Sequence, residues 1–232
     1  MQINFTNINF NYKNIMIKTE KLSFELPTDT EWMNLPENLP TNYEVEVDVY
    51  KWNINKAVVI IVWKWWTTEW YSNKYVTIAN NLLEHHWVNV FVVENPWISW
   101  DDPKKFTQCA FNFIDEKMKE FWYSSYKIYA MWFSAWGHFI WRFAYNYQSI
   151  EKILLINPVQ RVNNTVLIKS LNKFKWTWTI IVWDKDPDYF YTPLLDKVTS
   201  NIKIVTLKWV NHIFSNEWWL ETFIWLAEEY LF

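Results

Sequence analysis

The chain has 232 residues, of which 51% are hydrophobic, and a formal net charge of −3. This length favours a single domain with one substantial core, so we interpret residues 1–232 as one domain. The small net charge and the lack of a basic run argue against nucleic acid as a partner. The single cysteine, Cys109, excludes an internal disulfide. Its position on the apolar face of a helical pattern predicts a buried structural thiol.

The apolar stretches of the sequence are about as long as a strand, too short to span a bilayer. The first seven residues lack the basic and apolar regions of a secretory signal. We therefore expect a soluble cytoplasmic protein without a membrane span. The sequence has no H-E-x-x-H motif, cysteine cluster or P-loop, and the spacing of His85 and His86 does not suit a metal. We expect neither a metal nor a cofactor.

Tryptophan and glycine are present in unusual amounts. The chain has 20 Trp and one Gly, whereas an average chain of this length has about 16 Gly. Several tryptophans stand where a chain usually needs glycine. Trp87 and Trp122 each follow a helical pattern, at the position of a C′ glycine. Trp63, Trp65 and Trp66 lie in the loop after an apolar run.

These positions suggest that most of the tryptophans are glycine in the working protein. Some bacterial lineages decode UGA as glycine and others decode it as tryptophan, so one gene can give either sequence. The abundance of Asn, Ile, Lys, Tyr and Phe fits an AT-rich gene, and Arg142 and Arg161 are the only arginines. The alternative is a protein truly rich in tryptophan, with an aromatic surface that binds carbohydrate or membrane.

The first predicted unit is a β-rich segment, residues 1–56. Apolar and acidic residues alternate between positions 43 and 49, which predicts a strand with one solvated face. Residues 27–41 contain three prolines and are interpreted as a loop. We expect the acidic residues of the strand to face solvent rather than to form an acid/base site: Glu44, Glu46 and Asp48.

Residues 57–232 form the predicted core, in which apolar strands alternate with amphipathic helices. This order predicts an α/β fold with a mostly parallel sheet covered on both faces. In such sheets ligands bind at the carboxyl ends of the strands. The predicted strands are 58–62, 88–93, 127–131, 153–156, 179–182 and 202–206. The predicted helices are 72–86, 102–121, 135–147, 164–174, 190–200 and 216–231.

A nucleophile motif follows the predicted strand 127–131. Residues 132–138 read Trp-Phe-Ser-Ala-Trp-Gly-His. With glycine at 132 and 136, this is a G-x-S-x-G nucleophile elbow between a strand and a helix, with Ser134 exposed at the turn. The segment resembles the α/β-hydrolase family of serine hydrolases. Over residues 57–232, the resemblance implies the α/β-hydrolase fold, with a mostly parallel central sheet, helices on both faces and leading antiparallel strands.

Two further segments resemble that family in its chain order of serine, acid and histidine. Residues 183–187, Trp-Asp-Lys-Asp-Pro, resemble the acid turn and imply Asp186 as the triad acid. Asp184 and Asp188 are alternative acids. Residues 207–212, Leu-Lys-Trp-Val-Asn-His, resemble the histidine segment and imply His212 as the base.

The resemblance also implies an oxyanion hole. Its backbone N–H donors would be those of Ala135 and Lys64. Residues 62–66 resemble the family's H-G-x-G-G segment when glycine is restored, but Val62 replaces the histidine that the family often has. The predicted connection between strands 153–156 and 179–182 is short, which excludes a large lid.

These features imply hydrolysis of an ester, thioester or amide through an acyl-Ser134 intermediate. We expect a small-molecule acyl substrate and, first of all, a carboxylesterase. The alternatives are a serine peptidase of the same fold and a non-catalytic binding protein of that fold. An oligomeric state is not indicated. With tryptophan at 132 and 136, indoles would flank the nucleophile, and we predict an inactive chain.

Overall fold

In the computed structural model, the described residues belong to strands, helices and their adjoining turns. They are residues 16–25, 42–52, 54–62, 70–94, 103–121, 123–133, 144–158, 169, 172–173, 175, 177–185, 202–208 and 219–232. The elements in chain order are β1 (Met16–Glu25), β2 (Asn42–Lys51), β3 (Lys56–Ile61), α1 (Trp70–His86), β4 (Asn89–Val93), α2 (Pro103–Glu120), β5 (Lys127–Phe133), η3 (Ala144–Asn146), β6 (Ile150–Ile156), β7 (Thr177–Trp183), β8 (Ile202–Leu207) and α6 (Trp219–Leu231).

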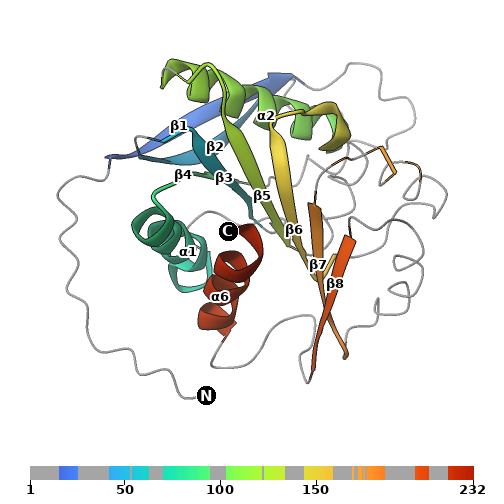
Figure 1. The fold of residues 1–232 in the computed structure, drawn as a ribbon. Helices are drawn as coiled ribbons and strands as arrows, with labels where there is room; N and C mark the ends of the chain where they lie inside the picture. The colour runs from blue at the N-terminus through green and yellow to red at the C-terminus, as the bar shows by residue number, and fades with distance from the viewer. Residues whose placement is uncertain are drawn as a thin grey trace, which may run out of the picture.

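The described strands form one eight-stranded sheet in the order β1-β2-β4-β3-β5-β6-β7-β8. Strands β1 and β2 pair antiparallel, and β2 pairs antiparallel with β4. From β4 to β8 every neighbouring pair is parallel. The predicted mostly parallel sheet with leading antiparallel strands is therefore confirmed (Figure 1).

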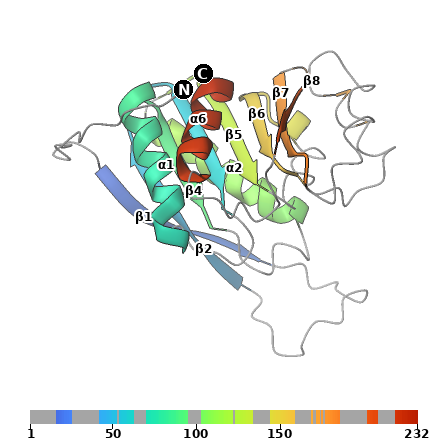
Figure 2. The same cartoon turned by 90° about the horizontal axis from the view of Figure 1, so that it is seen from below.

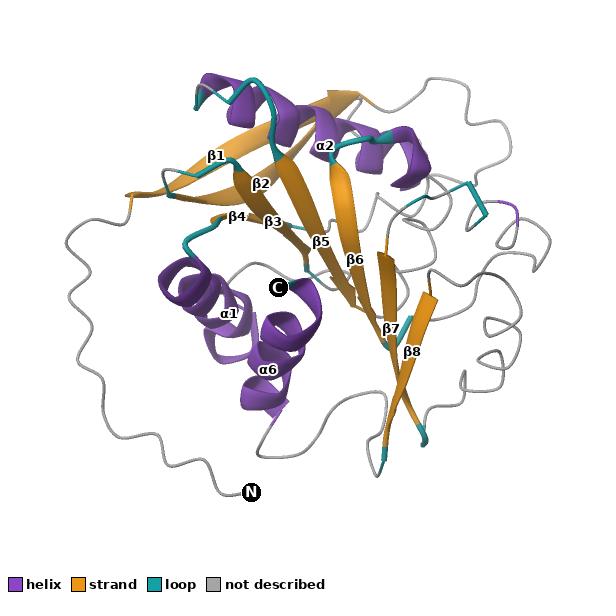
Figure 3. Ribbon diagram, viewed as in Figure 1, coloured by secondary structure: helices purple, strands orange, loops and turns teal. Residues whose placement is uncertain are grey.

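Helices cover both faces of the sheet. Helices α1 and α6 lie side by side on one face and α2 lies on the other (Figures 2 and 3). The inner parallel strands β3, β4 and β5 are apolar and buried over most of their length, as expected for strands covered on both faces, whereas the edge strand β8 is only partly buried. In β3, Val58 and Ile60 pack in the core beside α1 and α6, whereas Val59 and Ile61 pack in the core beside α2. None of the described helices is long and apolar enough to cross a bilayer.

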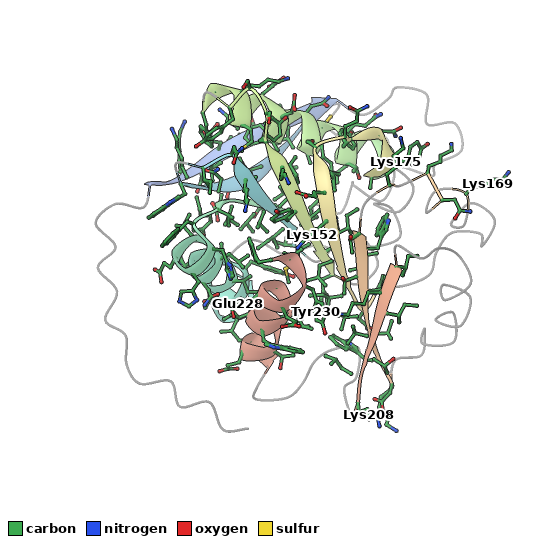
Figure 4. The ribbon with its side chains drawn as sticks, in the orientation of Figure 1. Lys152, Lys169, Lys175, Lys208, Glu228 and Tyr230 are labelled. Carbon is green, nitrogen blue, oxygen red and sulfur yellow. The ribbon has the colours of Figure 1, made fainter. Side chains whose placement is uncertain are left out.

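The last turn of α1 contacts the last turns of α6. His85 Nδ1 lies 3.2 Å from Glu228 Oε1, and the His86 ring stacks on Phe232 with 3.9 Å between centroids. Burial lowers the pKa of His86, although the Glu228 carboxylate opposes this shift. The two histidines therefore connect α1 to α6, in addition to standing at the end of α1. Glu228 is labelled in Figure 4.

The element boundaries agree with most of the predictions made from periodicity. The six predicted core strands and the helices at 72–86, 102–121 and 216–231 are present, with ends shifted by up to three residues. Of the predicted helix 135–147, the structure describes residues 144–147, and for these the prediction is wrong. Residues 144–146 form a 3₁₀ turn, closed by a 3.0 Å hydrogen bond from the Tyr147 N–H to the Ala144 carbonyl, which lets the chain turn into β6.

The predicted helix 164–174 is helical at Lys169 and gives way to a turn at Asn172 and Lys173. The other residues of that helix, the predicted helix 190–200 and the predicted loop 27–41 lie outside the described residues.

Two predictions about individual side chains were wrong. Asp48 was expected in solvent with Glu44 and Glu46, but it is only 8% exposed. Thr19, its partner on the neighbouring strand β1, donates a 2.7 Å hydrogen bond from its hydroxyl to the Asp48 carboxylate. Cys109 was expected to be buried, but it is half-buried. It lies at the margin of the apolar stripe of α2, where it lines a groove of about 350 Å³ beside β1.

One tryptophan has a backbone conformation that favours glycine. Trp87 follows α1 with a φ of 53°, and its N–H donates to the Leu83 carbonyl at 3.1 Å. This is the left-handed C′ position that the sequence predicted there. The indole is 61% exposed, so it adds little to the core. Trp63, Trp65, Trp66 and Trp122 lie outside the described residues.

Trp87→Gly is expected to raise the free energy of unfolding by about 1–2 kcal/mol, because glycine has no Cβ to clash in this conformation. Urea denaturation of the two chains measures the difference. Trp87→Ala is the matched control, since it removes the indole and keeps the Cβ. An alanine variant as stable as the glycine variant would show that the backbone conformation is not the cause.

Candidate active site

The carboxyl ends of the parallel strands meet along one edge of the sheet. Phe133 pairs with Ile156 at the ends of β5 and β6, and Trp183 pairs with Leu207 at the ends of β7 and β8. Neighbouring strands lie about 4.8 Å apart, so β7 and β8 run about 10 and 14 Å from β5. Figure 4 marks this edge by Lys208, the residue after β8.

Most of the predicted site residues lie outside the described residues: Ser134, Ala135, Lys64, Asp186, Asp188, Trp136 and His212. Asp184 is described. It follows β7 directly, is half-buried, and its N–H donates to the Leu207 carbonyl at 3.0 Å. Within the described ranges, His, Cys, Asp and Glu side chains do not gather in a group of three that could hold a metal.

The end of β5 is packed on both faces of the sheet. Trp132 is 1% exposed, and its ring lies 5.7 Å from that of Phe111 on α2. Phe133 points to the opposite face, where its ring lies 5.1 Å from that of Phe223 on α6. The Trp132 indole therefore lies in the core between the sheet and α2. Packing on both faces restrains the strand that leads directly into Ser134.

Asn157, at the end of β6, joins β6 to β7 and is not among the residues predicted from the sequence. It is 3% exposed and has a φ of 48°. Its N–H donates to the Ile181 carbonyl at 2.7 Å, and its Oδ1 accepts a 3.4 Å hydrogen bond from the Trp183 N–H. These contacts hold β6 to the end of β7, where the predicted acid turn begins. An asparagine directly after a buried strand was the available signal, because asparagine tolerates the left-handed conformation.

Solved structures with a similar fold include several esterases. Carboxyl esterase 2 from the mycorrhizal fungus Tuber melanosporum superposes with a TM-score of 0.63 at 14% identity, over 95% of this chain and 87% of that one. Est1E from Butyrivibrio proteoclasticus superposes with a TM-score of 0.60 at 14% identity, over 80% of this chain and 93% of that one. An alpha-beta serine hydrolase homologue from Coxiella burnetii gives a TM-score of 0.61 at 14% identity, over 80% and 91%. The protein has the α/β-hydrolase fold. Neither a protein-family profile nor a curated protein sequence matches the chain.

In this α/β-hydrolase fold, a buried lysine lies beside the end of β5. Lys74 on α1 is 5% exposed, and its Nζ lies 4.0 Å from the ring centroid of Phe223 and 4.6 Å from that of Phe133. Burial lowers the pKa of Lys74 to about 7. Lys74 is not among the residues predicted from the sequence. The available signal was its helical spacing from Ile78 and Leu82, both of which are fully buried.

The low pKa of Lys74 predicts that the protein becomes more stable as the pH rises from about 7 to about 10.5. In this window the unfolded chain keeps the proton that the folded protein has lost, so raising the pH favours the folded state. Below pH 7 both states carry the charge, and the cost of burying it is present in full. Lys74→Met should remove a cost on the order of a few kcal/mol at pH 7 and little at pH 10.5. Urea denaturation at both pH values measures this, and an equal gain at both would contradict it.

Proposed function

We propose that the protein is a serine hydrolase that cleaves an ester, thioester or amide through an acyl-Ser134 intermediate, with carboxylic esters as its first substrate class. One observation carries the proposal. The G-x-S-x-G motif, read with glycine at 132 and 136, begins at the end of the buried central strand β5. A nucleophile elbow needs this position, because the turn lifts the serine above the carboxyl edge of the sheet.

The proposed mechanism follows from the chemistry of the three residues. His212 removes the proton of the Ser134 hydroxyl while Ser134 Oγ attacks the acyl carbon. Asp186 orients His212 and stabilises the imidazolium that forms. The backbone N–H groups of Ala135 and Lys64 stabilise the oxyanion. His212 then protonates the leaving group, and an acyl-serine forms. Water attacks the acyl-serine with His212 again as base, which releases the acid and restores the serine.

The proposal includes glycine at most tryptophan positions. The left-handed conformation of Trp87 supports this for one position, since glycine adopts it without a steric cost. Positions 132 and 136 matter most for function, because the residues beside the nucleophile must be small for the turn to form.

Fluorophosphonate labelling of the protein from its natural source tests both proposals together. We expect the label on Ser134 and, by mass spectrometry of the labelled peptide, glycine at 132 and 136. An unlabelled Ser134 between two tryptophans would contradict the proposed enzymatic function, and the protein would then be a binding protein with this fold. Labelling in the presence of an ester or of a peptide distinguishes an esterase from a peptidase, because the true substrate protects Ser134 from the label.

The identity of the triad acid can be tested by paired amide variants. Asp186→Asn is expected to lower kcat by about 10⁴-fold, because an amide cannot stabilise the imidazolium or its tautomer. Asp184→Asn should keep kcat within a few-fold of the parent, since the proposed mechanism gives the carboxylate of Asp184 no role. Steady-state kinetics on a p-nitrophenyl ester measures both variants. The reverse order of effects would assign the acid to Asp184.

A further inference from the structure

Phe232, directly after α6, is held in place by three other elements. Its ring stacks on that of His86 at the end of α1, with 3.9 Å between centroids and 12° between planes. It also makes an edge-to-face contact with Tyr129 on β5, at a centroid distance of 5.6 Å. Lys152 on β6, labelled in Figure 4, donates a 3.2 Å hydrogen bond from Nζ to the main-chain oxygen of Phe232. Tyr129 and Lys152 lie near the starts of their strands, so this contact is at the opposite edge of the sheet from the candidate active site.

Two histidines face one carboxylate beside this contact. Glu228 Oε1 on α6 lies 3.2 Å from His85 Nδ1 and 3.7 Å from His86 Nε2. The second distance is too long for a hydrogen bond. His86 Nε2 is buried, and within the described part of the chain it has no hydrogen-bond partner. A neutral His86 ring needs no acceptor at this atom, because one nitrogen of a neutral imidazole carries no proton.

Protonation of His86 changes the demands of its surroundings. An imidazolium has an N–H at both ring nitrogens, and a buried N–H without an acceptor is costly. Burial lowers the pKa of His86, the Glu228 carboxylate opposes this shift, and His85 adds to it. Among the described residues, the titratable groups that act on His86 are thus Glu228 from α6 and His85 from α1. Tyr129 from β5 and Lys152 from β6 contact Phe232 on the same contact surface.

We propose that His86, Glu228 and Phe232 form a pH-sensitive clamp, in which protonation of His86 releases Phe232 and the last turn of α6. To reach water or Glu228 with its new N–H, the His86 ring must leave its place on the ring of Phe232. Opening is favoured as the pH falls below about 6.5, the ordinary pKa of histidine, because the open state binds the proton more tightly than the closed state. The inference does not depend on the proposed hydrolase function.

Hydrogen exchange measured by mass spectrometry at pH 7.5 and 5.5 tests the clamp. The parent is the full-length chain, in whichever of its tryptophan and glycine forms melts at the higher temperature. After correction for the intrinsic pH dependence of exchange, protection of residues 226–232 should fall several-fold at pH 5.5. The fall is limited to about tenfold, because this pH is about one unit below the ordinary pKa of histidine. Protection of the central strand β3 should stay the same.

Three variants assign the effect to the clamp. His86→Phe keeps a ring that can stack on Phe232 but cannot take a proton, so its protection of residues 226–232 should not change with pH. Glu228→Gln removes the facing carboxylate and should bring the loss at pH 5.5 closer to the tenfold limit. Lys152→Met is the matched control. It removes a contact of Phe232 but leaves His86 in place, so it should lower protection at both pH values and keep the parental ratio between them.

Three results would overturn the inference. Equal protection of residues 226–232 at both pH values in the parent would show that the contact does not respond to pH. An equal loss of protection in β3 would show that acid unfolds the whole protein rather than the clamp. A loss in His86→Phe as large as that of the parent would assign the effect to another group. The first two results come from the parent alone, so the test does not depend on the folding of any variant.

Discussion

Ser134→Ala is expected to lower kcat for ester hydrolysis by about 10⁴- to 10⁶-fold, because the acyl-enzyme can no longer form. The remaining rate would come from substrate binding and from the oxyanion donors alone. The melting temperature should stay close to that of the parent, since the serine is proposed to lie at a turn rather than in the core. Stopped-flow or steady-state assays with a p-nitrophenyl ester measure the loss, and fluorophosphonate labelling should disappear with it.

Ser125→Ala is the matched control for this experiment. Ser125 is exposed and precedes β5, at the opposite end of the strand from Ser134. Its replacement should leave both kcat and labelling unchanged. If Ser134→Ala keeps the parental rate, the enzyme proposal is wrong. The protein is then a binding protein with the α/β-hydrolase fold.

The chain with glycine at the tryptophan positions is expected to melt at a higher temperature than the chain as printed and to hydrolyse the ester, whereas the printed chain is inactive. Each tryptophan forced into a left-handed conformation costs about 1–2 kcal/mol. Several such sites would remove much of a typical stability of about 5–15 kcal/mol. Trp87 is one of them, and among the described tryptophans it is the one with a positive φ.

The opposite result has a clear physical basis. Trp132, Trp178 and Trp183 are fully buried in the core. If these residues are truly tryptophan, glycine at their positions leaves large cavities, at a cost of about 3–5 kcal/mol or more each. The glycine chain would then melt at a lower temperature than the printed chain. Thermal denaturation of the two chains, together with the ester assay, therefore distinguishes the two hypotheses. The melting temperature rises if glycine is the natural residue and falls if tryptophan is.

The sequence predicted most of the described core elements because their signals are local. The apolar stripe of α2, with Phe106, Ala110 and Ile114 one turn apart, and the continuous apolar run of β3 can be recognised without knowing their neighbours. The candidate nucleophile is also a local signal, since the strand, the turn residues and Ser134 are consecutive. The predicted acid and base rest on the resemblance, and they remain predictions.

Only the tertiary structure shows which polar side chains are buried. Asp48 alternates with Val47 and Val49 like a solvated residue, but it is buried and accepts a hydrogen bond from Thr19 on β1. Lys74 belongs to a helix whose other polar side chains are mostly half-buried, yet it is only 5% exposed, with its amine beside the rings of Phe133 and Phe223. The contacts themselves join residues that are far apart in the chain, so the alternation around Asp48 does not reveal its burial, and for Lys74 only the helical spacing from Ile78 and Leu82 gives a local signal.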